Sequence, residues 1–280
     1  MGMTVNTNLA SIVAQKNLAR NTSSLTKSVE RLSTGLRINR AADDAAGLAL
    51  STTFKAQIRS ISQAVRNAND AVSLLQTAEG GMTEMNNILL RMRELAEQSA
   101  NEALGDTERG YLNDEYVALK SEITRISDVT EFAGKKLLDG TISSSGVNFQ
   151  VGFKNTANDR LSFSMNDTDA VALGLNTTGA DSISTAALAQ SALEVIDQSA
   201  ITVVSDRRGS IGALQNRLEY TIANLTTTME NYQAANSRIE DADFALETAT
   251  YVKNQILIQA GTSVLAHANL LPQQALALLG

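Results

Sequence analysis

The sequence predicts a mainly α-helical protein: a long antiparallel coiled-coil-like helical bundle with a small β-hairpin region and paired N- and C-terminal helices. Three observations predict this fold. Apolar residues recur at alternating steps of four and three through most of the chain, which is the spacing of a coiled-coil seam. The only proline is Pro272, so almost nothing interrupts a helix. Aromatic residues make up 4% of the chain, which is typical of packed helices rather than a thick globular core.

Residues 5–36 are predicted to form the first helix. It carries three leucines one heptad apart, with further apolar residues between them. These leucines are Leu18, Leu25 and Leu32. Residues 36–44 are polar and crowded with charge, so this segment is expected to be a connector. Asp43 or Asp44 can accept hydrogen bonds from the free amides that open the next helix.

The second predicted helix is the longest. Its apolar seam covers residues 54–96, which corresponds to ~65 Å of helix. The seam contains one irregular three-residue step beside Gly80 and Gly81, where we expect the rod to loosen or bend. A turn at 101–106 then leads to a shorter helix with an apolar seam over 112–126. The short connection predicts that this helix packs back, antiparallel, on the rod.

The pattern changes in the middle of the chain. Residues 147–153 and 161–165 alternate between apolar and polar side chains, and the polar segment 154–160 separates them. This pattern predicts two strands joined in a β-hairpin, which needs packing against helices to persist. Residues 166–184 are rich in Thr, Asp and Gly and are expected to form a loop.

A second long rod follows over residues 193–239, where the heptad seam resumes. The polar sequence Arg207, Arg208 and Gly209 is expected to interrupt it. A second acidic connector then leads into the apolar end of the chain. The order of segments is thus mirrored about the β-hairpin region, with one rod and one apolar terminal segment on each side of it. We therefore expect the two rods to lie together, and the two terminal segments to lie together.

This order divides the chain into five parts. They are an N-terminal helix (1–42), the first half of a helical rod (43–139), a short β-hairpin and loop segment (140–185), the second half of the rod (186–241) and a C-terminal helix (242–280).

Both ends of the chain lack charge. No charged side chain occurs in residues 1–15 or in 254–280, yet both segments carry broad apolar helical faces. Polar residues interrupt the C-terminal segment too often for a membrane span, so no membrane insertion is expected. These uncharged faces must be buried against protein, and we interpret them as a self-assembly surface. Its candidate residues are Val5, Leu9, Ile12, Leu257, Ile258, Val264, Leu265 and Leu271.

The composition excludes several functions. The formal net charge of −7 disfavours binding to nucleic acid phosphates. The absence of cysteine excludes disulfides and thiolate chemistry. The one histidine, His267, cannot build a two-histidine metal site and is interpreted as a packed or interface residue. Helix capping explains Asp43 and Asp44 better than a catalytic carboxylate pair does. Taken together, these features lead us to expect no enzyme activity, cofactor or metal site.

Several motifs together resemble bacterial flagellin. The head matches at VNTN (5–8), ERLSTGLRIN (30–39) and DDAAG (43–47), the first rod at RNAND (66–70), RMREL (91–95) and QSAN (98–101), and the tail at SRIEDAD (237–243) and QAGTSVL (259–265). The resemblance covers about 1–140 and 190–280. It implies a filament subunit for motility, whose paired terminal helices form the inner core. The short middle implies a form without the large outer domains of many flagellins.

The resemblance also implies a location and partners. The subunit would form a homopolymer in the extracellular flagellar filament, after leaving the cell through the flagellar export channel without a cleaved signal. The first residues fit this route, because they lack a basic segment followed by an apolar run. A flagellin export chaperone would hold the C-terminal helix. The export apparatus and the cap and junction proteins would be further partners.

Three alternatives stay open at this stage. The hook–filament junction protein resembles flagellin at both ends, although the long tail match favours flagellin. A flagellin with a catalytic insert is disfavoured by the short middle and the single histidine. A coiled-coil adhesin is disfavoured by the uncharged ends, because an anchor would need a true span or a lipid site.

The flagellin family also implies recognition by the animal Toll-like receptor for flagellin. By the resemblance, the receptor contacts map onto Arg91, Leu95 and Glu122. Arg91 and Leu95 lie four residues apart and so share a helix face. Because that face lies off the predicted seam, we expect it to be free for a partner. The competing interpretation is that Arg91 and Glu122 form ion pairs and Leu95 borders the core.

Overall fold

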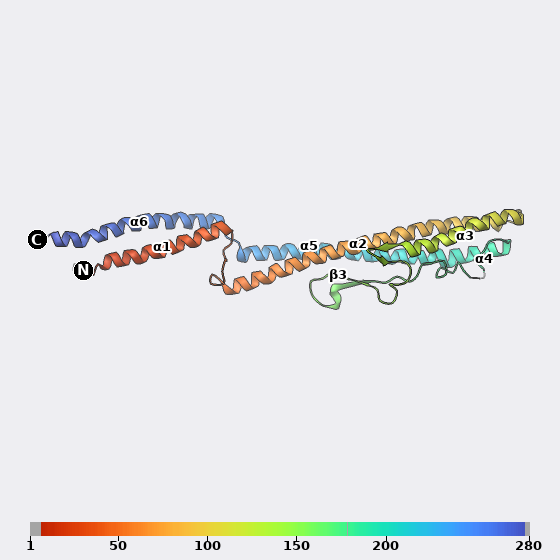
Figure 1. The fold of residues 1–280 in the computed structure, drawn as a ribbon, viewed down its shortest axis with the longest axis horizontal. Coiled ribbons are helices and arrows are strands. Elements are labelled where there is room, and N and C mark those ends of the chain that lie inside the picture. The colour runs from red at the N-terminus through yellow and green to blue at the C-terminus, as the bar shows by residue number, and fades with distance from the viewer. Residues whose placement is uncertain (1–6, 178, 278–280) are drawn as a thin grey trace. The chain divides into compact units, whose positions relative to one another are not determined.

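The computed structural model describes residues 7–177 and 179–277, with side chains as far as Leu270. Its helices are α1 (Leu9–Thr34), α2 (Ala45–Ser99), α3 (Asp106–Val129), α4 (Ala186–Val195), α5 (Ile201–Glu240) and α6 (Phe244–Ala277). Its strands are β1 (Glu131–Phe132), β2 (Lys135–Lys136), β3 (Val147–Gln150) and β4 (Arg160–Phe163). The predicted mainly helical fold is confirmed (Figure 1).

The chain forms two compact units. One contains the described residues up to Ile58 and from Glu230 onward, and the other is Arg59–Met229. The five-part division given by the sequence, with boundaries at 42 and 242, stays a prediction.

The unit Arg59–Met229 has a continuous apolar core. The α2 seam residues are completely or almost completely buried, and they meet apolar residues of α3, α4 and α5. The buried α2 residues include Ala68, Leu75, Ala78, Met82, Met85, Leu89, Met92 and Ala96. The methionines are therefore core residues, as their spacing indicates.

The expectation that the rod loosens at Gly80 and Gly81 is wrong, because α2 runs through both residues as an unbroken helix. Gly81 instead permits close packing. A Cβ atom at Gly81 would lie 2.9 Å from Thr130 Oγ1 and 3.0 Å from Leu138 Cδ1, whereas a Cβ at Gly80 would meet nothing within 4 Å. The segment after α3 therefore rests directly on the α2 backbone at Gly81.

The predicted hairpin is confirmed. β3 and β4 pair antiparallel, with Val147 opposite Phe163 and Gln150 opposite Arg160. A second, very small hairpin, β1–β2, was not predicted. Its two-residue turn has positive φ at Ala133 (51°) and Gly134 (76°), as type I′ turns require, but Ala is a poor signal for this turn.

The predicted interruption at Arg207, Arg208 and Gly209 is also wrong, since α5 passes through it. The irregularity lies earlier, in a π-helical turn at Ile196–Ala200 that joins α4 to α5. Here the buried residues are spaced by four residues three times in succession. On a regular helix of 3.6 residues per turn, such a stripe would gradually rotate away from the core. A wider π turn takes up the additional residue and keeps this stripe on the core. The stripe is Ala192, Ile196, Ala200 and Val204.

The other unit contains the predicted pairing of the terminal helices, which is confirmed. α1 and α6 lie side by side and antiparallel (Figure 1). At one end of the pair Asn8 Nδ2 donates to the carbonyl of Ala268 at 2.7 Å. At the other end Leu36 and Asp241 form an antiparallel bridge between the two connectors.

The two adjacent glycines give a matched test of this packing. Gly80→Ala should raise the free energy of unfolding by about 1 kcal/mol, because alanine favours an exposed helix and meets no neighbour. Gly81→Ala should lower it by about 1–3 kcal/mol, because the new methyl group overpacks against Thr130. Urea unfolding of both variants measures the difference. Equal effects of the two substitutions would contradict the proposed contact.

Candidate assembly surface

The interface between α1 and α6 follows a coiled-coil spacing and mixes large apolar residues with small and polar ones. The α1 positions toward α6 recur at steps of three and four, and those of α6 do the same. On α1 they are Ser11, Ala14, Leu18, Asn21, Leu25, Ser28 and Leu32, and on α6 they are Tyr251, Asn254, Ile258, Gly261, Leu265 and Ala268. The residues of the pair that are most buried are small or polar: Ser11, Ser28, Asn254 and Ala268. The large apolar residues of the seam, such as Leu18 and Ile258, are only half-buried in the single chain.

Small residues set the spacing of the two helices. A Cβ atom at Gly261 would lie 3.3 Å from Leu18 Cδ1, so the leucine packs against the α6 backbone. Asn8 caps α1 through its side-chain oxygen, which accepts from the amide of Ser11 at 3.1 Å. Its amide group binds Ala268, so one residue both begins α1 and attaches it to α6.

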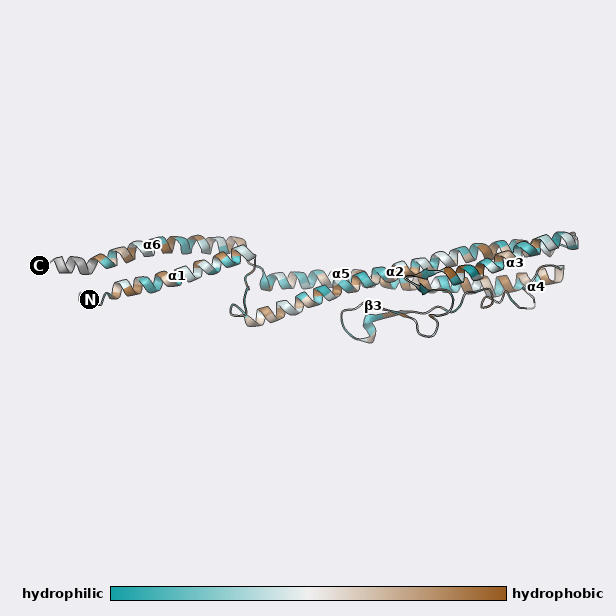
Figure 2. Cartoon of the chain, in the orientation of Figure 1, coloured by the Kyte–Doolittle hydropathy of each residue, from teal (hydrophilic) through white to brown (hydrophobic). Residues whose placement is uncertain are grey.

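Large apolar side chains lie on the outside of the pair. We call the following residues the outer apolar surface: Leu9, Ile12, Val13 and Val29 on α1, and Phe244, Leu246, Val252, Ile256, Leu257, Val264 and Leu270 on α6. Leu9 is 62% exposed and Phe244 is 59% exposed. Figure 2 shows strongly hydrophobic residues along the length of both helices. The distribution is the reverse of a self-sufficient helix pair, which buries its large side chains.

A shallow apolar depression of about 790 Å³ lies on this surface of α6. Phe244, Ala245, Val252 and Ile256 line it, together with Thr248, Ala249 and Lys253. Small and large residues both line it, a mixture against which the side-chain ridges of another helix can pack.

The predicted assembly residues divide between the two faces. Leu9, Ile12, Leu257 and Val264 belong to the outer apolar surface. The half-buried Ile258 and Leu265 lie instead in the seam with α1. Val5 and the side chain of Leu271 lie outside the described part of the chain.

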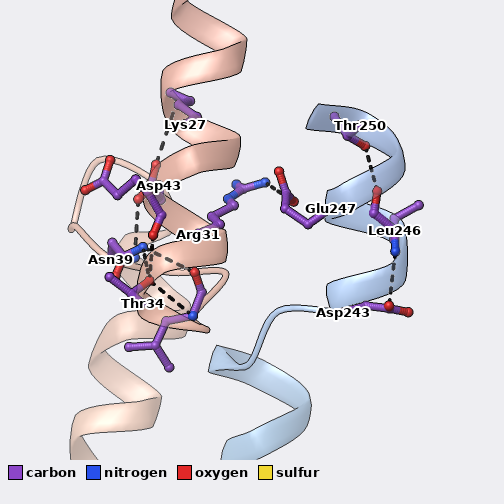
Figure 3. Close-up of polar contacts among 11 residues, drawn as sticks. Lys27, Arg31, Thr34, Asn39, Asp43, Asp243, Leu246, Glu247 and Thr250 are labelled. Atoms are coloured by element: carbon purple, nitrogen blue, oxygen red, sulfur yellow. Dashed lines mark hydrogen bonds and ion pairs between the residues drawn. The ribbon is translucent and has the colours of Figure 1, made fainter. Parts of the chain in front are cut away.

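Charged and capping groups gather where the connectors join the helices (Figure 3). Arg31 pairs with Glu247 across the two helices at 3.5 Å, and Lys27 pairs with Asp43 at 3.9 Å. Asp43 also accepts from the amide of Arg40. Asp243 caps α6 by accepting from the amide of Leu246 at 3.1 Å.

The interpretation of the Asp43–Asp44 pair as structural agrees with these contacts. Asp44 Oδ1 accepts from the amide of Gly47 at 2.9 Å and so caps the start of α2. Asp43 holds the connector against α1. His267, interpreted from sequence as packed, is exposed on α6 in the single chain.

The three residues predicted to contact a receptor are not equivalent. Arg91 is half exposed and pairs with Glu94 and Glu115. Glu122 pairs with Arg125 at 2.6 Å, and the hydrogen bond from Arg125 lowers the pKa of the Glu122 carboxyl. Leu95 is only 1% exposed, so the expectation that it lies on a free face is wrong. The α2 position 95 faces the core, one turn beyond the exposed Arg91.

Within residues 7–177 and 179–277, no group of three His, Asp or Glu side chains could hold a metal ion. In the same part of the chain, no helix is long and apolar enough to cross a bilayer.

A helical protein that carries paired terminal helices with a bare apolar exterior belongs to the class of self-assembling polymer subunits. Two family models narrow the class: the bacterial flagellin N-terminal helical region matches residues 5–143, and the C-terminal helical region matches residues 193–279. The chain belongs to the bacterial flagellin family.

Individual relatives agree with this assignment. A flagellin of Halalkalibacterium halodurans is 46% identical over 277 residues, covering 99% of this chain and 100% of the relative. A flagellin of Bacillus subtilis is 43% identical over 306 residues, with 99% and 100% coverage. The crystal structure of Bacillus cereus flagellin superposes with a TM-score of 0.51 at 34% identity, over 61% of this chain and 94% of that one.

The protein is therefore a structural subunit of the extracellular bacterial flagellar filament and not an enzyme. Its 280 residues fit a form without large outer domains. These matches give no support to the alternative of a hook–filament junction protein.

Proposed function

We propose that the outer apolar surface of α1 and α6 is the face through which this subunit binds neighbouring copies in the filament. The observation that carries the proposal is the reversed distribution of side chains in the pair. The fully buried positions of the seam hold small and polar groups, while many large apolar side chains face outward. Full burial of one such side chain contributes about 1.5–3 kcal/mol, so a filament that covers several of them gains a large stabilisation.

The absence of charged side chains at the two ends of the sequence supports the same function. Residues 254–280 contain no charged side chain, and neither do residues 1–15. Burying an ion costs several kcal/mol unless it finds a partner, and an uncharged surface avoids that cost. The charged groups of the pair are concentrated near the connectors, as between Arg31 and Glu247.

The outer apolar surface also gives a physical reason for an export chaperone. Before assembly α6 presents Phe244, Val252, Ile256 and Leu257 to solvent, and such an apolar face invites non-specific association. A flagellin export chaperone that covers α6 would prevent this. Passage through the flagellar export apparatus, without a cleaved signal, would then deliver the subunit to the cap and junction proteins outside the cell.

Recognition by the animal Toll-like receptor for flagellin stays a prediction, now limited to exposed groups. Arg91 pairs with Glu115, and Glu115 and Glu122 lie seven residues apart on one face of α3. Arg91 and Glu122 are therefore about 10 Å apart along the helix axes and can meet one partner. The buried Leu95 would act by packing α2 rather than by touching the receptor.

The assembly proposal predicts a clear effect of charge on α6. Ile256→Asp and Val264→Asp should each abolish polymerisation, because each would bury an unpaired carboxylate between copies. Ile256→Met is the matched control, since it keeps an apolar side chain of similar volume and should polymerise. Sedimentation and negative-stain microscopy measure filament formation. Filaments of normal yield from both Asp variants would refute the proposal.

The receptor proposal is tested with free subunits in a receptor reporter assay. Arg91→Ala should weaken signalling about tenfold, the effect of losing one interfacial arginine. Arg217→Ala is the control, because Arg217 is an exposed arginine on α5 of the same unit. Leu95→Ala is unsuitable, because a buried leucine to alanine change costs about 2–5 kcal/mol of stability. Equal signalling by the Arg91 variant and the parent would end the proposal.

A further inference from the structure

Glu240 is a buried carboxylate at the end of α5. It is 3% exposed, and among the described residues no other Asp or Glu is buried. Buried carboxylates are costly unless hydrogen bonds and an opposite charge surround them. The surroundings of Glu240 therefore indicate what the carboxylate does.

Three donors from two helices converge on the Glu240 carboxylate. Ser51 Oγ on α2 donates to Oε2 at 2.5 Å, and Asn236 Nδ2 on α5 donates to the same oxygen at 3.2 Å. Lys55 on α2 forms an ion pair with Oε1. Ser51 is itself 1% exposed, so this contact is sheltered from water. The carboxylate thus fastens the start of α2 to the last turn of α5.

The backbone beside Glu240 holds the connector of the N-terminal helix. The Glu240 carbonyl accepts from the amide of Arg37 at 2.6 Å, and the Arg37 guanidinium donates to the carbonyl of Ile239 at 2.7 Å. Leu36 bridges Asp241, and the amide of Ala242 donates to the carbonyl of Gly35 at 2.9 Å. The two connectors thus form a short ladder that satisfies the free carbonyls at the end of α5.

Charged groups on each neighbouring element define the electrostatics of the site. Lys55 approaches from α2, Arg37 from the first connector and Asp241 from the second. Burial alone would raise the pKa of the Glu240 carboxyl, but the hydrogen bonds from Lys55, Ser51 and Asn236 outweigh burial. The net result is a pKa below its ordinary value.

We propose that Glu240 is an acid-released clamp: its ionised carboxylate fastens the start of α2 to the last turn of α5, the turn whose carbonyls hold the first connector, and protonation loosens this turn and the connectors bound to it. A protonated carboxyl accepts more weakly from Ser51 and Asn236 than the ionised carboxylate does. Protonation also removes the partner of Lys55. This role goes beyond assembly through the outer apolar surface.

The sign of the pH dependence follows from the lowered pKa. A carboxylate whose pKa is lower in the folded state stabilises that state above its unfolded pKa of about 4.3. The stabilisation is lost as the pH falls through the folded pKa. The clamp is therefore closed at neutral pH and opens only in acid.

The test is hydrogen exchange of the Arg37 and Ala242 amides in filaments between about pH 7 and pH 3, corrected for intrinsic exchange. In the parent, protection should fall about tenfold below pH about 4.3. Glu240→Gln mimics the protonated carboxyl, so its protection should already be about tenfold lower at pH 7 and nearly independent of pH. Glu219→Gln, which changes an exposed carboxylate on α5, should behave as the parent.

A second variant keeps the carboxylate and changes its partner. Lys55→Gln removes a charge that lowers the Glu240 pKa, so the acid transition should move to higher pH. This result is informative even if Glu240→Gln does not assemble. The proposal is overturned if Glu240→Gln keeps the acid transition of the parent, or if Lys55→Gln leaves its midpoint unchanged.

Discussion

The structure depends on an imbalance between the two faces of the terminal helix pair. The α1–α6 seam contains Ser11, Ser28 and Asn254 at its most buried positions, while Leu9, Phe244 and Ile256 remain in water. Helices in isolation gain little stability from propensity alone and need an apolar face to be buried. The pair therefore lacks the interaction that would make it stable by itself. Contacts with other copies can supply that interaction, and this requirement couples order in the termini to the filament.

The unit Arg59–Met229 shows the opposite balance and can serve as a stable support. Its seam buries Leu75, Met82, Met85 and Leu89 completely, and Gly81 lets the segment after α3 rest on the backbone of α2. Where the connectors join the terminal pair to the ends of α2 and α5, polar contacts are prominent. Arg31–Glu247 joins the two terminal helices, and Glu240 joins α2, α5 and the connectors. Polar contacts of this kind specify geometry and respond to pH, whereas an apolar core does not.

The sequence was sufficient for features that rest on periodicity. The α2 seam, the β3–β4 hairpin and the pairing of the ends follow from side-chain spacing, and all are present. It failed where tertiary packing overrode local propensity. Gly80 and Gly81 disfavour helix in isolation, but α2 stays helical through them within the packed unit. The spacing of apolar residues predicts Leu95 outside the seam, but the buried face of α2 is wider than that seam and includes Leu95. The Glu240 clamp could not be predicted, because its partners lie almost 190 residues away in the chain. Which terminal residues face inward, as Ile258 does, also depends on the partner helix.

The central claim is that the terminal helices gain most of their stability from other copies. Hydrogen exchange of α6 amides between Phe244 and Leu270, compared in monomer and filament at one pH and temperature, tests it most directly. The account predicts that these amides exchange at least about a hundredfold faster in the monomer, while those of the buried α2 seam from Ala68 to Ala96 stay protected in both states. Equal protection of α6 in monomer and filament would contradict it.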